Sequence, residues 1–298
     1  MPIMALADTD PGMLPPSANL ARLDAVFGAR SVRVGRQGAV VSVRELGEGP
    51  AVVCLHGIGS GAASWLGLAE RMAPRARLIA WDAPGYGAST PLSSLTPDAT
   101  DYAVRLHQLL DALEIERCTL LGHSLGALTA VAAASAETSG ERAARFDRVI
   151  LASPARGYGA QGPLAATVRA ERLALLRTEG IDGMAAMRSA RLLSPKASAQ
   201  ARQWVRWNMA RLHAGGYRQA VELLCGEDLV RHLPLAVPVQ VWVGALDEIR
   251  PPRACDEIAR AAQTTLQLIA DAGHACYVEQ PDAVASLLCT VLEEDRGA

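Results

Sequence analysis

A single serine stands between two glycines in the segment LLGHSLGALTA, residues 120–130. Ser124 follows an apolar run typical of a strand and precedes an alanine-rich run typical of a helix. Side chains beside the serine would clash in so sharp a turn, which explains Gly122 and Gly126. The turn raises the hydroxyl above the sheet and aims the N–H of Leu125 at whatever the serine attacks. We therefore interpret Ser124 as a nucleophile; an ordinary strand-to-helix turn is the alternative, because the glycine–serine–glycine pattern alone is loose.

A neutral serine hydroxyl is a poor nucleophile and needs a base. Of the six histidines, only His274, in DAGHACYVEQP, occupies the loop between the last predicted strand and the last predicted helix. That loop is expected at the same carboxyl edge of the sheet as Ser124. An imidazole with an ordinary pKa of ~6.5 can take a proton and return it near neutral pH. His274 is therefore the predicted base, although by itself it would fit a lone surface histidine.

The base in turn needs an acid that holds its tautomer and stabilises the imidazolium. The segment VQVWVGALDEIRPP places Asp247 after Gly244, at the end of a β-rich run. Glu248 is the adjacent rival, and Asp271 is too close to His274 in sequence to reach the far side of the ring. Three independent placements thus agree on Ser124, Asp247 and His274 as a catalytic triad.

Glycines also punctuate LHGIGSG, residues 55–61, directly after another predicted strand. They let the backbone approach a substrate closely, so we predict that the N–H of Ile58 joins that of Leu125 in an oxyanion hole, with Gly57 in the pocket wall. A phosphate cradle is the alternative, but the spacing typical of phosphate-binding glycine loops is missing. A third glycine-rich turn, WDAPGYGAS at 81–89, is assigned a structural role.

Short β-rich runs alternate with helical stretches along the chain, which predicts a mainly parallel sheet covered on both faces. The expected strands are Val40–Val43, Ala51–Leu55, Arg77–Trp81, Cys118–Leu121, Arg148–Ala152, Val239–Val243 and Thr265–Ile269. A helix is expected after Thr96, taken as its N-cap, with Pro97 and Asp98 in its first turn. We expect helices at 127–136 and, after Pro281, along the last apolar periodic stretch.

The alternation breaks between about Pro154 and Pro234, where four helices are expected at 163–177, 181–193, 197–213 and 216–224. We interpret residues 154–234 as a helical cap over the strand ends, inserted in a core made of 21–153 and 235–298. The first twenty residues, with four prolines and no cationic start before an apolar stretch, are expected to form a flexible arm rather than a signal peptide.

The bulk composition is ordinary for a globular protein, with 298 residues, half of them apolar, and a formal net charge of −2. So small a charge gives no field that would attract nucleic acid or a membrane surface. The six cysteines are scattered without a C-x-x-C pair, which predicts reduced thiols and a cytoplasmic location. The expected partner is a small-molecule substrate; a homodimer stays open.

Taken together, LHGIG, WDAPGYGAS, GHSLGALTA, GALDEIRPP and DAGHACYVEQP resemble, in this order, the motifs of the α/β-hydrolase superfamily over roughly 51–294. The resemblance implies an α/β-hydrolase fold: a mostly parallel eight-stranded sheet with flanking helices and a helical cap inserted late in the sheet. It places nucleophile, acid and base on Ser124, Asp247 and His274, and the oxyanion donors on Ile58 and Leu125. It also implies hydrolysis with no metal and no organic cofactor.

Within the superfamily the chain is most similar to the 3-oxoadipate enol-lactonase group and related esterases, through GGYRQAVELLCGEDL, the acid segment and VEQP. That group usually has D-x-R-G-H-G where this chain has DAPGYG. The expected activity is therefore serine-dependent cleavage of a small carboxylic ester or lactone. One alternative is a carbon–carbon bond hydrolase of aromatic ring-fission products, although those typically have tryptophan where Ala275 stands. The other is a non-catalytic ligand receptor with a hydrolase fold.

Charge in the cap bears on the substrate. Residues 156–231 contain eleven arginines and one lysine against six acidic residues, a net charge of +6. A cationic cap would suit a carboxylate-bearing substrate, with Arg156, Arg188 and Arg206 as candidates, although most of these arginines also fit solvated helix faces. Trp204 and Trp207, together with Tyr158 and Tyr217, are expected to line an apolar pocket, although packing of its helix against the core would explain Trp204 equally well.

Overall fold

The computed structural model describes residues 17–136 and 145–297 and contains one eight-stranded sheet. Its strands run in the order β1-β2-β4-β3-β5-β6-β7-β8. β1 and β4 both pair antiparallel with β2, and the remaining pairs are parallel. The strand bounds are Ala29–Val34, Ala39–Leu46, Ala51–Leu55, Arg77–Trp81, Cys118–His123, Phe146–Ala152, Val239–Gly244 and Leu266–Ile269, for β1 to β8 respectively. The expected mostly parallel eight-stranded sheet is confirmed.

β1 is the strand that the apolar runs did not mark. Four of its six residues are exposed, and only Val32 and Val34 are buried. The reason is that β1 lies at the edge of the sheet. An edge strand buries only one face, so arginine and serine occupy its other positions. A short strand with that composition carries little apolar signal.

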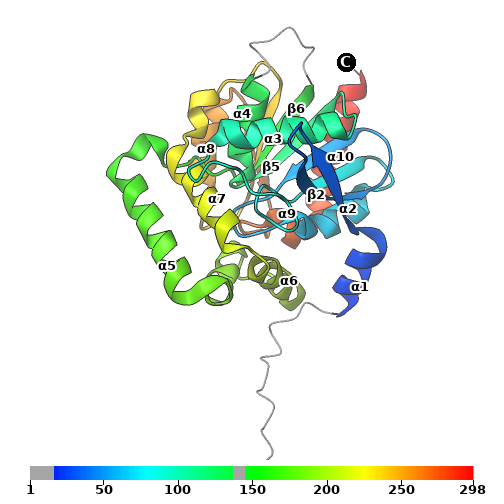
Figure 1. Cartoon of the computed structure of the whole chain (residues 1–298). Coiled ribbons are helices and arrows are strands. Elements are labelled where there is room, and N and C mark those ends of the chain that lie inside the picture. Colours follow the sequence, from blue (N-terminus) through cyan, green and yellow to red (C-terminus); the bar gives the residue numbers. More distant parts are fainter. Residues whose placement is uncertain (1–16, 137–144, 298) are drawn as a thin grey trace, which may run out of the picture.

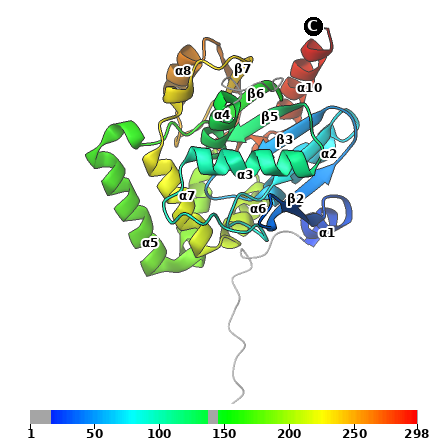
Figure 2. The same cartoon turned by 45° about the horizontal axis from the view of Figure 1, so that its top comes forward.

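Alternating side chains of the central strands feed two hydrophobic cores. In β3, Val53 and Leu55 belong to one core, and Val52 and Cys54 to the other. The first core is covered by α3, α4 and α8 and the second by α1, α2 and α10 (Figures 1 and 2). These six helices are Ala99–Ala112, Gly126–Ala136, Pro252–Ala261, Ser17–Val26, Leu66–Met72 and Pro281–Gly297, in that order. Burial on both faces is what near-continuous apolar strands require.

Two boundary predictions need correction. Helix α3 is capped by Asp98 and not by Thr96: the Asp98 carboxylate accepts from the N–H groups of Thr100 and Asp101, and the Asp101 side chain reaches back. The Asp98 carboxylate is within reach of the free N–H groups of the first turn, whereas the Thr96 hydroxyl lies two residues too early in the chain. The predicted arm lies mostly outside the described residues, but residues 17–20 belong to α1, and Asn19 is buried.

The chain between β6 and β7 is helical: α5 Pro163–Arg188, a short 3₁₀ helix η4 Ser189–Leu192, α6 Ala199–Ala210 and α7 Ala214–Gly226. Figure 1 shows α5, α6 and α7 gathered on one side of the core. Helix α5 is broken at Gly180, whose φ of 65° and ψ of −169° are not helical. The break divides α5 into two helical stretches, and the helices expected at 163–177 and 181–193 lie on either side of it; the end of the second expected helix is the 3₁₀ helix η4.

Several hydrogen bonds attach the helical segment to the core, and two sets of them bear on the site. The side chain of Gln219 on α7 donates to the carbonyls of Leu92 and Ser94 at 2.8 and 2.7 Å. The carboxylate of Glu279 accepts from the N–H and hydroxyl of Ser194 and from the N–H of Gly273. The second contact joins the segment directly to the loop that carries His274.

None of the described helices is long and apolar enough to span a membrane.

Candidate active site

Ser124 lies in a strained turn between β5 and α4. Its φ is +50°, a left-handed conformation that non-glycine residues seldom adopt. Its N–H donates to the carbonyl of Ala152 at 3.0 Å, and its own carbonyl accepts from Ala127 and Ala155 at 3.1 and 3.0 Å. These bonds to both neighbouring segments hold a conformation that costs on the order of 1–3 kcal/mol when unsupported.

The two glycines beside Ser124 are dictated by close packing. A Cβ at Gly122 would lie 2.8 Å from the Cα of Ala127, and one at Gly126 would overlap the carbonyl oxygen of Leu55. Only glycine therefore fits at these two positions. This agrees with the steric reason for which the motif predicts a sharp turn.

His274 and Asp247 form a buried hydrogen-bonded pair. The Nδ1 of His274 donates to Oδ2 of Asp247 at 2.9 Å, and both residues are 3% exposed. The other carboxylate oxygen accepts from the N–H groups of Ile249 and Arg250 at 2.9 and 2.8 Å. Burial alone would raise the pKa of Asp247, but the hydrogen bond from His274 and the Arg250 N–H hold that pKa below its ordinary value. Asp247 is thus a carboxylate, and it leaves Nε2 of His274 free to accept a proton.

The two rival acids lie elsewhere. Asp271 pairs with Lys196 at 2.5 Å, away from the imidazole. Glu248 is exposed in the wall of the same cavity as His274. The structure therefore brings Asp247, and neither rival, to the His274 ring.

His123, the variable residue of the serine motif, supports the His274 loop. Its Nε2 donates to the carbonyl oxygen of His274 at 2.9 Å, and the two rings lie 4.9 Å apart. Burial, followed by the charge of His274, lowers the pKa of His123 to about 3. His123 is consequently a neutral donor that fixes the backbone of the predicted base.

The peptide between Gly57 and Ile58 is held in one orientation. Its carbonyl accepts from Nδ1 of His56 at 2.9 Å and from the N–H of Ser60 at 3.1 Å. Because C=O and N–H point opposite ways in a trans peptide, these bonds aim the N–H of Ile58 away from His56. The hydroxyl of Tyr86 donates to the carbonyl of Ile58 at 3.0 Å and fixes the next peptide as well. Tyr86 belongs to WDAPGYGAS, so this turn also orients the predicted oxyanion donor.

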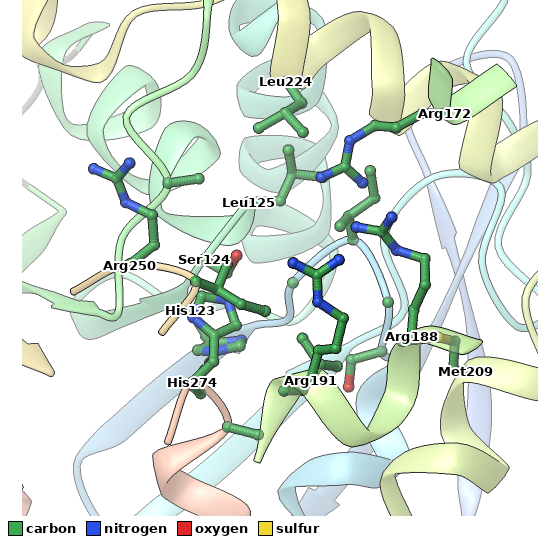
Figure 3. Close-up of a pocket in the computed structure, with 18 of the residues that line it drawn as sticks. His123, Ser124, Leu125, Arg172, Arg188, Arg191, Met209, Leu224, Arg250 and His274 are labelled. Atoms are coloured by element: carbon green, nitrogen blue, oxygen red, sulfur yellow. Dashed lines mark hydrogen bonds between the residues drawn. The ribbon is translucent and has the colours of Figure 1, made fainter. Parts of the chain in front are cut away.

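A cavity of about 540 Å³ lies at this site. It is lined by Gly57 and Ile58. Ser124, Leu125 and His274 line it as well (Figure 3). In the described part of the chain, neither the N–H of Ile58 nor that of Leu125 has a backbone acceptor. The cavity therefore collects a hydroxyl, an imidazole and two available N–H groups, which is the equipment for acyl transfer.

Two predicted pocket residues do not line this cavity. Trp204 is buried in the second core, and Trp207 stacks on it at 4.9 Å, with the guanidinium of Arg211 over the Trp207 ring. The opposite face of α6 supplies Val205 and Met209 to the cavity instead. The prediction was wrong because large aromatic side chains on an amphipathic helix also serve the core, and sequence alone does not show which face turns inward. Tyr158 and Tyr217 do line the cavity.

Arginines are the part of the site that the sequence located least well. Five line the cavity: Arg156, Arg172, Arg188, Arg191 and Arg250. Of the three candidates, Arg156 and Arg188 are among them and Arg206 is not. Arg172 and Arg191 were missed, because only the kink in α5 directs them to the same place.

Comparison with known proteins agrees with this fold. A family model described as "Alpha/beta hydrolase family" matches residues 52–287. The chain is 36% identical over 110 residues to a 2-hydroxy-6-oxononadienedioate/2-hydroxy-6-oxononatrienedioate hydrolase of Pseudomonas putida, covering 35% of this chain and 38% of that protein. It is 26% identical over 255 residues to a putative carbamate hydrolase of Cronobacter turicensis, covering 80% and 89%. The first curated relatives it matches are covered over only about a quarter of their length.

Among solved structures, the enol-lactonase of Burkholderia xenovorans has a TM-score of 0.77 at 24% identity, with 89% of this chain and all of that chain covered. At this identity the likeness concerns the fold. The family model covers most of the chain, which therefore belongs to the alpha/beta hydrolase family.

Proposed function

We propose that this protein is a serine hydrolase that cleaves a small carboxylic ester or lactone through an acyl-enzyme. The observation that carries the proposal is that the strained Ser124 lines the same cavity as His274, whose ring is hydrogen-bonded to the buried Asp247. Ester and lactone carbonyls are the electrophiles that a neutral, base-activated serine attacks readily.

In the first half of the reaction, Nε2 of His274 takes the proton of the Ser124 hydroxyl as Oγ attacks the carbonyl carbon. The N–H groups of Ile58 and Leu125 stabilise the oxyanion of the tetrahedral intermediate. Collapse of the intermediate breaks the bond to the leaving oxygen, which receives the proton from His274. Asp247 stabilises the imidazolium meanwhile and holds its ring orientation.

In the second half, His274 removes a proton from water and the resulting hydroxide attacks the acyl carbon. The proton then returns to Ser124, and a carboxylic acid leaves. A lactone follows the same path, except that the alcohol and the acyl group remain one molecule.

A second candidate is hydrolysis of a carbon–carbon bond beside a ketone. It is favoured by the similarity to a hydrolase named for a 2-hydroxy-6-oxo dienedioate. A screen that pairs small esters and lactones with a coloured ring-fission dienoate separates the candidates, because the second predicts conversion of the dienoate alone.

The decisive variant is Ser124→Ala. We expect turnover of p-nitrophenyl esters to fall by at least about 10⁴-fold while the unfolding midpoint stays near that of the wild type, because the variant removes only the nucleophile. A fluorophosphonate probe should label the wild type and not the variant, as observed by intact-mass spectrometry. A wild-type protein that stays unlabelled would instead support a ligand receptor.

A further inference from the structure

Three arginines of the helical segment converge on the cavity beside Ser124. Arg172 and Arg188 come from α5 and Arg191 from η4, and Figure 3 shows their guanidinium groups directed into the same space near Leu125. We propose that these three side chains, here called the arginine cluster, bind a terminal oxyanion group of the substrate, away from the carbonyl that Ser124 attacks. This inference rests on the proposed function and names its substrate class.

The cluster has no internal counter-charge. Among the described residues, no carboxylate lies within ion-pair distance of the three guanidinium groups. Their one hydrogen bond in this part of the chain is from Arg172 to the hydroxyl of Tyr217 at 3.3 Å. Two acidic residues in the cavity wall, Glu171 and Glu248, are exposed and pair with none of them. The cavity therefore holds a surplus of positive charge at one end.

Other arginines nearby are already occupied. Arg156 pairs with Asp228 at 3.0 Å, and Arg250 donates to the carbonyl of Pro154 at 3.0 Å. Among the arginines that line the cavity, Arg172, Arg188 and Arg191 are the three for which the described part of the chain shows neither a carboxylate nor a backbone partner. Arg172 and Arg188 are half-buried and Arg191 is exposed, and all three line the cavity.

The convergence of these arginines depends on a break in the helix at Gly180. Arg172 and Arg188 are separated by sixteen residues, which would place them about 24 Å apart along a straight helix. The break at Gly180 interrupts the straight course of α5, and both arginines line one cavity. The positive φ of Gly180 in the middle of a long helix is therefore a requirement of the arginine cluster.

Bringing like charges together costs free energy. Burial, then the charges of Arg172 and Arg191, lower the pKa of Arg188. An anion between the guanidinium groups would relieve this repulsion and restore hydrogen bonds that burial removes. Such a site consequently selects ligands with a negative group.

The shared ligand chemistry is a terminal oxyanion, which a carboxylate or a phosphate monoester can supply. Each guanidinium offers a planar pair of donors to two oxygens of either group. Apolar side chains, among them Leu192, Val205 and Met209, complete the cavity wall. A short aliphatic chain that joins the anionic end to the ester carbonyl would fit this lining.

The test compares two esters on the same protein: 4-nitrophenyl hydrogen adipate, which carries a carboxylate, and 4-nitrophenyl heptanoate, a neutral ester of similar length. We expect the wild type to favour the adipate ester in kcat/KM by at least about 10-fold, the effect of a charge-assisted hydrogen bond. Arg188→Gln should lower that ratio about 10-fold, and Arg188→Lys should restore part of it. Partial unfolding lowers both values and leaves the ratio unchanged.

Arg177→Gln is the matched control, because Arg177 is exposed on the same helix and outside the cavity wall. It should leave the ratio at the wild-type value. Competition against the neutral ester then identifies the anion: inhibition by adipate indicates a carboxylate, and inhibition by inorganic phosphate alone indicates a phosphate monoester. Either inhibition should weaken in Arg188→Gln.

The inference is overturned if the wild type hydrolyses the neutral ester as well as the adipate ester, or if Arg188→Gln leaves the ratio unchanged. If neither ester is hydrolysed, the proposed function fails, and calorimetric titration with adipate and with phosphate decides the inference separately. Binding to the wild type that weakens about 10-fold in Arg188→Gln supports the cluster; absence of binding by both anions refutes it.

Discussion

At the scale of single residues, the site depends on backbone positions as much as on reactive side chains. Ser124 keeps a left-handed φ because the segments on both sides of it donate to and accept from its backbone. The N–H of Ile58 is aimed by bonds to the carbonyl of its own peptide. Preorganisation of this kind lets polar groups meet developing charge without rearranging.

Gly126→Ala tests how much of this geometry a single Cβ can disturb. The added Cβ would overlap the carbonyl oxygen of Leu55, and the backbone of β3 cannot move aside as a flexible side chain would. We expect the free energy of unfolding in urea to fall by about 3 kcal/mol. Gly215→Ala is the control, because a Cβ there meets nothing within 4 Å. Equal urea midpoints for the two variants would show that the turn has room to spare.

Asp247→Asn tests the acid of the buried pair. The amide would still occupy the carboxylate position, but it would favour the wrong tautomer of His274 and could not stabilise an imidazolium. In a comparable triad such a change costs about 10⁴-fold in kcat. We expect a loss of that order here, measured with p-nitrophenyl esters at neutral pH. Glu248→Gln, at the exposed adjacent acid, is the comparison, and a loss there as large as in Asp247→Asn would move the acid role to Glu248.

At the scale of elements, helices of the cap divide their faces between the core and the cavity. Helix α6 turns Trp204 toward the core and Val205 and Met209 toward the cavity. Helix α5 reaches the cavity twice because it breaks at Gly180. The shape of the binding space is therefore set by helix rotation and by one kink.

Gly180→Ala tests the kink. The φ and ψ values at this position belong to a region that is essentially glycine-only, so alanine adds about 1–3 kcal/mol of strain although no atom lies within 4 Å of its Cβ. We expect the second half of α5 to shift and the preference for 4-nitrophenyl hydrogen adipate over the heptanoate to fall. Gly226→Ala, also in open space but without a positive φ, should keep the preference. An unchanged preference in Gly180→Ala would show that the arginine cluster does not depend on the kink.

At the scale of the whole molecule, the cap and the His274 loop form one connected structure. The Glu279 carboxylate joins Ser194 to Gly273, and the N–H of Ala275 donates to the carbonyl of Leu192 at 2.8 Å. The cap is thereby joined by hydrogen bonds to the segment that holds the predicted base. His56 and His123 are also buried in this region, and both have lowered pKa values, chiefly because of burial.

These buried histidines predict an acid-sensitive fold. Between pH 6.5 and about 3, His123 binds a proton in the unfolded chain and not in the folded one, so the free energy of unfolding falls as the pH falls. From pH 7 to pH 5 this group alone should remove about 2 kcal/mol. His123→Asn should reduce the difference between urea unfolding at pH 7 and at pH 5 by about that amount. An identical pH dependence in the variant would rule out His123 as a source of acid sensitivity.

The sequence alone was enough for features that depend on local chemistry. The alternation of strands with helices predicted the fold class. The glycines beside a serine pointed to Ser124, because a sharp turn requires them. An acid and a histidine after successive strands pointed to Asp247 and His274, because the ends of those strands meet at one sheet edge. Proline and aspartate before α3 located that helix, although the N-cap was placed two residues early.

Tertiary structure alone decided the rotation of α6, the break in α5 and the meeting of Arg172, Arg188 and Arg191. These features arise from packing between elements distant in sequence: a tryptophan suits either a core or a pocket, and an arginine suits either solvent or a ligand. The amino-acid type is the same in both cases, and the choice depends on which neighbours the folded chain places opposite it.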